Sequence, residues 1–223
     1  MARGDETELA LTATALADLH NLDMTNRPGS EQLPRSRWLE LMRPEGLLSE
    51  LHAIADRIPP ELESRYAFCI DTLNNVRGWP EVPMTLLHSD CNPDNAVRTS
   101  RNRVTLIDWD GAGVGPAVVD LAYLIFHCHL RQPSWPVIEP NAAWIAAIVR
   151  AYGERRPFVG PELRCLREAI ALVECHALAR SLPGAVRGDW SNDRGFTRFL
   201  GREKRVGEIA AQCMAACQSS GWL

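Results

Sequence analysis

Apolar residues recur at helical spacing along most of the chain. In residues 5–22, Leu9, Ala13, Leu16 and His20 fall on one face of a helix that ends near a proline–glycine pair. The same period predicts further helices, separated by loops rich in proline, glycine and arginine, at 45–57, 60–77, 117–130, 140–152, 161–181 and 195–217. The chain is therefore predicted to be mainly α-helical.

The period changes in the middle of the chain. Residues 84–87 form a short apolar run after a proline, which predicts a strand, and residues 88–95 are polar with a proline among them, which predicts a loop of fixed shape. Residues 95–98 and 103–107 flank the turn sequence Thr-Ser-Arg-Asn and predict a β-hairpin. The expected fold class is thus α+β, mainly α-helical, with a small β-hairpin set among the helices.

Polar side chains gather at this hairpin. Asp90 stands in the loop, Asn95 follows at its end, and Asp108 ends the second strand. Antiparallel pairing brings the loop and the strand end side by side. A carboxylate such as Asp90 can hold or accept the proton of an attacking hydroxyl, and oxygen ligands such as Asn95 and Asp108 are those that Mg²⁺ prefers. The pattern predicts a metal-assisted phosphoryl-transfer site.

These segments carry a family resemblance. HSDCNPDN (88–95), IDWD (107–110) and DLA (120–122), in this order, resemble the HxDxxxxN, IDW(D/E) and DLA motifs of the aminoglycoside phosphotransferase and choline kinase family. LADLH (16–20) resembles the LAxLH helix that opens the C-terminal lobe of that family. The resemblance covers almost the whole chain. It implies the C-terminal lobe of the protein-kinase-like fold, as a single domain over residues 1–223.

The resemblance also implies an enzymatic activity. Members of the family transfer the γ-phosphoryl group of ATP, with Mg²⁺, to a hydroxyl of a small molecule such as an aminoglycoside, an amino alcohol or a sugar. By this match Asp90 is the catalytic aspartate, and Asn95 and Asp108 are the magnesium ligands. The expected activity is that of a small-molecule kinase.

Further matches concern supporting residues. Asp120 matches the helix aspartate that braces the catalytic loop through its backbone, and His88 matches a supporting histidine rather than a base. Asp110 is either a carboxylate just behind the metal ligands or an exposed residue. Ser89 departs from the pattern, since the family most often has glycine there and a serine restricts the backbone.

The half that clamps the nucleotide has no match in the sequence. Such kinases hold ATP between two lobes, and a β-rich N-terminal lobe provides a phosphate loop and a lysine. Here the only lysine is Lys204, and no alternating strand pattern precedes the first helix. We therefore expect the N-terminal lobe to be absent, and the nucleotide-binding residues stay unassigned.

Three interpretations of that absence stay open. The chain is a fragment or a mis-started form of a full kinase, a chain that pairs with a separate N-terminal lobe, or a non-catalytic kinase-derived module that binds a ligand or a protein. A cleft face left without its covering lobe also predicts a tendency to self-associate. The first interpretation is favoured because the whole set of Asp90, Asn95 and Asp108 is present.

A glycine-rich segment offers a rival interpretation. Residues 111–116, Gly-Ala-Gly-Val-Gly-Pro, follow an apolar strand and superficially suggest a dinucleotide-binding turn. Pro116 stands where the third glycine of that motif belongs, and Asp108 and Asp110 would point negative charge at the pyrophosphate. We expect instead that these glycines form a short loop across the mouth of the active site.

Composition and charge indicate which kinds of protein and partner the sequence fits. With 223 residues, 46% hydrophobic and 23% charged, the chain is typical of a folded globular protein, and a net charge of -4 without a basic patch argues against nucleic acid as a partner. An acidic start without an export signal leaves the cytoplasm as the expected location. The longest apolar run, 118–126, is too short to span a membrane.

The cysteines and the candidate substrate-contacting residues carry weaker signals than the motifs do. Seven cysteines without a CxxC pair predict reduced thiols. A zinc site is the less favoured alternative, because its candidate ligands lie in apolar helices: His127, Cys128, His129, Cys175 and His176. Acidic side chains could meet a cationic aminoglycoside and tryptophans could line a choline site, although solvated helix faces and core aromatics are the commoner explanations for Glu168, Glu174, Trp144 and Trp190. The substrate stays open.

Overall fold

Helices make up most of the architecture. The computed structural model describes residues 5–24, 34, 36, 44–76, 81–128, 140–188 and 205–222. Within these ranges the helices are α1 (Glu6–His20), α3 (Pro44–His52), α4 (Glu63–Asn75), α5 (Ala117–Cys128), α6 (Ala142–Arg155), α7 (Gly160–Val186) and α9 (Val206–Ser219), with 3-10 turns η2 (Ala55–Arg57), η3 (Pro60–Leu62) and η4 (Pro93–Asn95). Each predicted helix has a counterpart, so the mainly helical α+β class is confirmed. The beginning of the last predicted helix, 195–204, lies outside the described residues, and so does Lys204.

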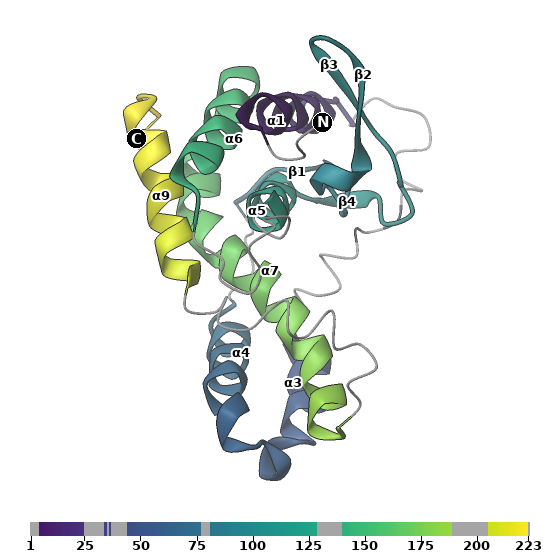
Figure 1. The fold of residues 1–223 in the computed structure, drawn as a ribbon, viewed down its shortest axis with the longest axis vertical. Helices are drawn as coiled ribbons and strands as arrows, with labels where there is room; N and C mark the ends of the chain where they lie inside the picture. Colours follow the sequence, from purple (N-terminus) through teal and green to yellow (C-terminus); the bar gives the residue numbers. More distant parts are fainter. Residues whose placement is uncertain are drawn as a thin grey trace.

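Local sequence explains where the helices begin. The side chain of Asp5 accepts a hydrogen bond from the N–H of Glu8 at 2.7 Å and so caps α1, and Glu6 and Glu8 lie in the first turn, where the helix dipole favours acidic residues. Asn141 caps α6 in the same way, because its side-chain oxygen accepts hydrogen bonds from two backbone N–H groups. These caps fix the starts of the two helices that pack side by side in the upper part of Figure 1.

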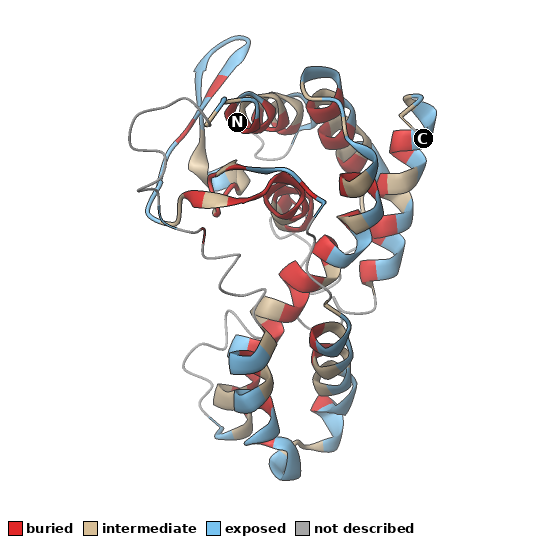
Figure 2. Ribbon diagram, turned by 180° about the vertical axis from the view of Figure 1, so that it is seen from behind, coloured by how far each residue is buried: buried red, intermediate tan, exposed pale blue. Residues whose placement is uncertain are grey.

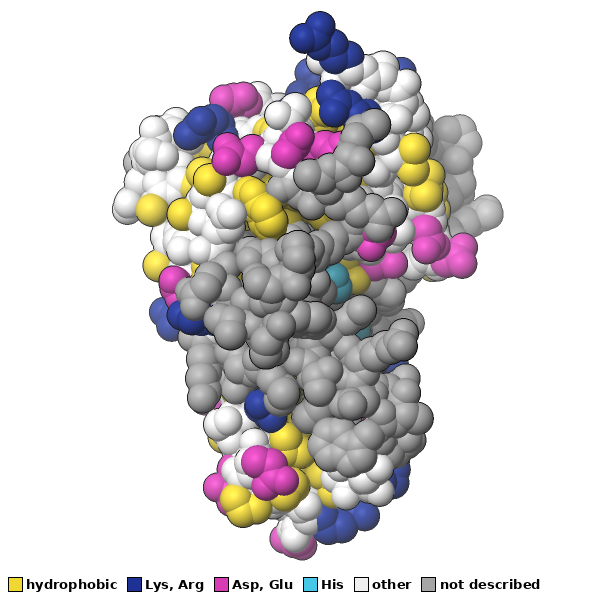
Figure 3. All heavy atoms as spheres, in the orientation of Figure 1, with side chains coloured by type: hydrophobic (Ala, Val, Ile, Leu, Met, Phe, Trp, Pro, Cys, Tyr) yellow, Lys and Arg dark blue, Asp and Glu magenta, His cyan; other side chains and the backbone are white. Residues whose placement is uncertain are grey.

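Two small antiparallel sheets lie beside the helices. Strand β1 (Met84–Leu87) pairs with β4 (Gly113–Pro116), and β2 (Ala96–Ser100) pairs with β3 (Arg103–Leu106). The β2–β3 hairpin projects beyond the rest of the fold next to α1 (Figure 1), and basic side chains gather at that end of the molecule (Figure 3). The predicted strand and the predicted hairpin are therefore confirmed.

Residues 113–116 differ from the sequence prediction. They form strand β4 and not a loop across the mouth of the active site. A Cβ atom at Gly115 would lie 2.6 Å from Cδ1 of Leu87, so glycine is what lets β4 approach β1 this closely. The other edge of β4 is also occupied, because the backbone N–H of Ser36 donates to it. A segment with hydrogen bonds on both edges is part of the core and is not a free loop.

Helix α7 is the central element of the core. It packs against α3, α4, α5 and α9, and it runs through both the upper and the lower part of the molecule (Figure 1). Figure 2 shows that α5 and the middle of α7 are largely buried. By length and apolar composition alone α7 could cross a membrane, but 56% of that apolar window is buried inside the fold. This burial is what a core helix shows, and α7 also carries the buried carboxylates Glu162 and Glu174.

The cysteines are free thiols, as predicted. Six of the seven are buried, and only Cys165 is partly exposed. Burial raises the pKa of the Cys91 thiol, which follows Asp90, and it raises the pKa of Cys128 as well. These side chains therefore stay protonated and behave as small core residues.

Candidate active site

Asp120 holds the start of the predicted catalytic loop. It lies in the first turn of α5 and is fully buried. Its Oδ2 accepts a hydrogen bond from the backbone N–H of His88 at 2.7 Å, and its Oδ1 accepts one from the N–H of Ser89 at 2.9 Å. A carboxylate that accepts two backbone hydrogen bonds fixes the path of the main chain. The structure thus brings Asp120 to the loop at the position where the motif placed it.

His20 and Tyr152 extend this contact into the core. The imidazole Nε2 of His20 lies 3.4 Å from Oδ2 of Asp120, and its Nδ1 lies 2.7 Å from the hydroxyl of Tyr152. Burial lowers the pKa of His20 despite the neighbouring carboxylate, so the ring is neutral at pH 7. The neutral ring then donates from Nε2 to Asp120 and accepts from the Tyr152 hydroxyl at Nδ1. Helices α1, α5 and α6 are joined beneath the loop by these three side chains.

The carboxylate of Asp90 is held by several donors. The side-chain amide of Asn95 donates to the Asp90 carbonyl oxygen at 2.9 Å and to Oδ2 at 3.1 Å. The amide of Asn92 lies 3.3 Å from Oδ1, and the hydroxyl of Tyr123 donates to the same oxygen at 2.6 Å. The loop and the first turns of α5 therefore fix the direction of this carboxylate.

His88 connects the loop to the hairpin. Its side chain is fully buried, Nε2 donates to the carbonyl oxygen of Ile107 at 2.9 Å, and Nδ1 accepts from the N–H of Asp90 at 3.3 Å. The ring also packs against Trp109, with 4.5 Å between the ring centroids. Both ring nitrogens are occupied by backbone groups, so this histidine has no lone pair to offer to a substrate.

The hairpin places Asn95 next to the residue that precedes Asp108. The N–H of Ile107 donates to the carbonyl oxygen of Asn95 at 2.9 Å, which continues the β2–β3 register by one pair. Asp108 then turns away from the strand with φ 64°, and its side chain is exposed. Asp110 is exposed as well and lies in the turn that follows. Asp108 is thus the residue that follows the Asn95–Ile107 pair, at the end of the hairpin where the loop carries Asp90.

The donor atoms at this end fit a hard divalent cation. The Nδ2 of Asn95 is turned to Asp90, which leaves the carbonyl oxygen of the amide for a ligand, and Asp108 adds an exposed carboxylate. Mg²⁺ commonly takes one or two oxygen ligands from protein and the rest from water and phosphate. Within the part of the chain that the structure describes, no three His, Cys, Asp or Glu side chains come together, which leaves the zinc alternative without support there. His129 lies outside the described residues.

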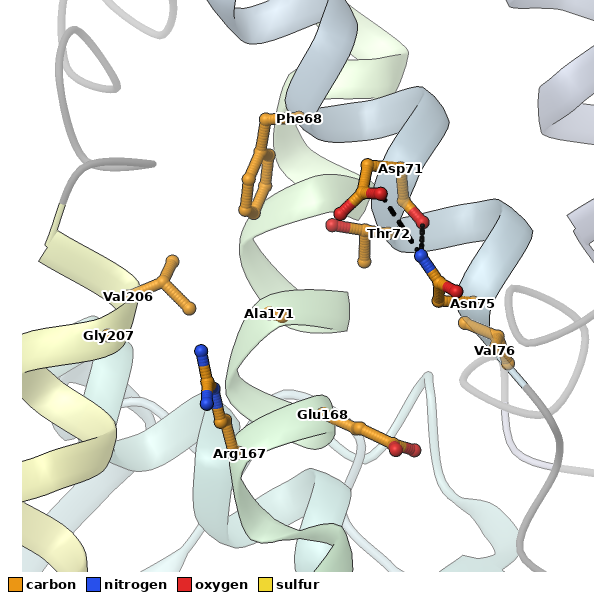
Figure 4. A pocket seen from close by; sticks show the side chains of 10 residues that line it. All are labelled: Phe68, Asp71, Thr72, Asn75, Val76, Arg167, Glu168, Ala171, Val206 and Gly207. Atoms are coloured by element: carbon orange, nitrogen blue, oxygen red, sulfur yellow. Dashed lines mark hydrogen bonds between the residues drawn. The ribbon is translucent and has the colours of Figure 1, made fainter.

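The side chains that the sequence suggests as substrate contacts do not gather around Asp90. Glu174 is fully buried, so it does not meet a solvent-borne cationic substrate as the sequence had allowed. Glu168 lines a pocket of about 490 Å³ between α4, α7 and α9 (Figure 4) that contains none of the motif residues. Trp144 is half-buried against the core, and Trp190 lies outside the described residues. Side-chain type alone suggests these residues, and it does not specify which way a helix faces.

Ser89 has a backbone conformation that favours glycine. Its φ is 65°, in the left-handed region, and its buried hydroxyl has no hydrogen-bond partner among the described residues. A non-glycine residue in this region costs about 1 kcal/mol, and an unbonded buried hydroxyl costs about 1–3 kcal/mol. The departure from the family pattern therefore falls on the residue where glycine is conformationally preferred.

Ser89→Gly is expected to stabilise the fold. It removes both costs, and the greater freedom of glycine in the unfolded chain offsets about 0.5–1 kcal/mol of the gain, so the free energy of unfolding should rise by about 1–3 kcal/mol in urea titrations. Ser49→Gly, the same change at an exposed position in the middle of α3, is the control and should lower it by about 0.5–1 kcal/mol. A lower stability for Ser89→Gly would show that the serine hydroxyl has a bonding role.

The amino-acid sequence matches the model of a known protein family. A sequence model described as the phosphotransferase enzyme family (APH) matches residues 3–168, which include all the motif residues above. The chain belongs to this family. The resemblance inferred from the motifs is thereby confirmed.

Solved phosphotransferases and kinases share the fold. Macrolide 2'-phosphotransferase MphH from Brachybacterium faecium is 18% identical over 90% of this chain and 61% of that one, with a TM-score of 0.52. Amicoumacin kinase hAmiN in complex with AMP-PNP, Ca²⁺ and Ami is 12% identical over 93% and 60%, with a TM-score of 0.56. A choline/ethanolamine kinase family protein from Mesorhizobium loti is 16% identical over 95% and 66%, with a TM-score of 0.57. The chain thus spans somewhat under two thirds of the length of these phosphotransferase structures.

Proposed function

We propose that the protein is an ATP- and Mg²⁺-dependent phosphotransferase that transfers the γ-phosphoryl group to a hydroxyl of a small molecule. The observation that supports this proposal is the hydrogen bond from the Asn95 amide to the Asp90 carboxylate, at the end of the β2–β3 hairpin where Asn95 pairs with the residue before Asp108. Membership of the phosphotransferase family supports it. The cytoplasm, where ATP is available, is the proposed location.

In this mechanism Asp90 orients the acceptor. Its carboxylate accepts a hydrogen bond from the attacking hydroxyl and takes its proton as the new P–O bond forms, while the bond from the γ-phosphorus to the β–γ bridging oxygen breaks and ADP leaves. Asn95 and Asp108 would hold the cation, which when bound neutralises charge on the β- and γ-phosphates. Asp120 and His88 act indirectly, because they bind the backbone N–H groups of residues 88 to 90 and so fix the main chain that leads into Asp90. Little covalent chemistry is asked of the protein, so positioning supplies most of the catalysis.

We further propose that residues 1–223 correspond to the C-terminal lobe of the full enzyme. The chain covers 60–66% of each of the compared structures, one of which was solved with AMP-PNP and Ca²⁺. A second lobe, in a longer chain or a separate one, would then supply the groups that clamp the nucleotide. A hydroxyl-bearing antibiotic or amino alcohol is the substrate class that these relatives suggest.

The test is a phosphoryl-transfer assay with a metal-site variant. We expect transfer from ATP to at least one alcohol in a panel of aminoglycosides, macrolides, choline and sugars, measured by ³¹P NMR, and its loss in EDTA. Asp108→Asn should lower the rate by roughly 100-fold or more, since a lost ligand weakens the stabilisation of charge. Asp56→Asn is the matched control, the same change at an exposed position of η2 outside all the motifs, and should change the rate by less than about 3-fold.

The assay also distinguishes the enzymatic proposal from its alternative, a non-catalytic binding module. It is run on this chain alone and on a version extended by any in-frame upstream codons. Transfer that appears only with the extension supports a shared site completed by a second lobe. No transfer by either version, together with unchanged ligand binding in Asp108→Asn, would contradict the enzymatic proposal and favour a kinase-derived binding module.

A further inference from the structure

Tyr123 touches the carboxylate of Asp90 from helix α5. It follows Asp120 by three residues, so both side chains lie on the face of α5 that meets the loop. Its hydroxyl donates to Oδ1 of Asp90 at 2.6 Å, whereas the amides of Asn95 and Asn92 lie 3.1 Å and 3.3 Å from the carboxylate oxygens. An O–H···O⁻ contact of this length is a strong, charge-assisted hydrogen bond.

The phenol ring of Tyr123 is itself held in place. It stacks on His127, one turn further along α5, with 3.9 Å between the ring centroids and 21° between the planes. The surrounding residues of α5 are buried in the core and pack against α7. The hydroxyl therefore sits on a rigid support, and its position does not depend on the loop.

The other two donors belong to the loop that they brace. Asn92 and Asn95 are two and five residues from Asp90, and the same short turn carries all three. If the loop shifts, these amides shift with it. Tyr123 differs because it connects the carboxylate to a core helix, and it thereby fixes the direction of Asp90 relative to the rest of the fold.

We infer that Tyr123 is a positioning residue for phosphoryl transfer, whose hydroxyl fixes the orientation of the Asp90 carboxylate toward the acceptor. This inference rests on the function proposed for Asp90. Near-attack geometry requires the accepting oxygen to be held within a fraction of an ångström. A phenol anchored on α5 provides such a restraint, and neither the DLA motif nor the HxDxxxxN motif includes it.

Tyr123→Phe tests the inference because it removes the hydroxyl and keeps the stacked ring. We expect kcat for the acceptor reaction to fall roughly tenfold or more, with the KM for ATP nearly unchanged. Tyr66→Phe, the same change at a half-buried tyrosine of α4, is the control and should leave both constants unchanged. A purely structural role for Tyr123 would lower the melting temperature and leave kcat per folded molecule as it was.

A double-variant comparison separates this inference from the proposed function. In an Asp90→Asn background, Tyr123→Phe should have no additional effect on the rate, because the hydroxyl acts through the carboxylate. If Asp90→Asn is inactive and Tyr123→Phe alone is fully active, only the inference fails. If Asp90→Asn transfers phosphate as well as the unchanged protein does, the proposed function fails instead.

Crystal structures supply a measurement that needs no activity. The unchanged protein should show the Asp90 carboxylate within hydrogen-bond distance of Tyr123, and the Tyr123→Phe variant should show it rotated away or spread over several conformers. A carboxylate that keeps the same position and order in Tyr123→Phe would overturn the inference.

Discussion

Asp90→Asn is expected to lower kcat for phosphoryl transfer by about 10²–10⁴-fold, the range for loss of a general base. The change keeps the size of the side chain but replaces a proton acceptor with an amide. It also turns an NH₂ group toward the donors that now surround the carboxylate, from Asn92, Asn95 and Tyr123. The affinity for ATP should change little, because Asp90 acts on the acceptor.

The control lies in the same loop. Asp94 is exposed, and Asp94→Asn makes the same chemical change four residues away. Steady-state and single-turnover rates for both variants, with the acceptor identified by the transfer assay, give the comparison. Equal rates for Asp90→Asn and Asp94→Asn would contradict the role of Asp90 as the general base.

Asp120→Ala is expected to produce the largest loss of stability. The buried carboxylate accepts hydrogen bonds from the N–H groups of His88 and Ser89 and from the ring of His20, and alanine would leave all three donors buried without an acceptor. Removing one partner of a buried polar group of this kind costs about 3–5 kcal/mol. Against a typical total stability of about 5–15 kcal/mol, the melting temperature should fall by roughly 10 °C or more.

Thermal unfolding with two companion variants checks this expectation. Asp18→Ala removes an exposed carboxylate that pairs with Arg155 on the surface, and its cost should stay below about 1 kcal/mol. Asp120→Asn keeps one acceptor oxygen and should fall between Asp120→Ala and the unchanged protein. A melting temperature for Asp120→Ala within about 2 °C of the unchanged protein would contradict the bracing role.

The elements that could be predicted from the sequence are those that a local pattern of residues encodes. Helical spacing identified the helices, because the buried residues of α1, such as Leu9 and Leu16, follow the period that an amphipathic helix requires. The hairpin followed from its turn and strand composition, and its register pairs Asn95 with Ile107, the residue before Asp108. The motif residues were found because they lie close together in the sequence and in order.

Contacts between distant segments could not be predicted in this way. Tyr123 and Tyr152 carry no pattern that distinguishes them from ordinary core aromatics, and their hydrogen-bond partners lie 33 and 132 residues away. His20 was recognised only as part of one helix face. The strand at 113–116 was missed because its glycines indicate a loop by composition, whereas their lack of side chains is what allows close pairing with β1.

The position of α1 has a consequence for how the protein is made. Its His20 side chain bonds to Asp120 and Tyr152, which are 100 and 132 residues further along the chain. A ribosome releases this helix long before those partners exist, so its apolar face stays uncovered until α6 has emerged. Nascent chains that stop before that point should recruit chaperones, and the catalytic loop should acquire its final shape only near the end of translation.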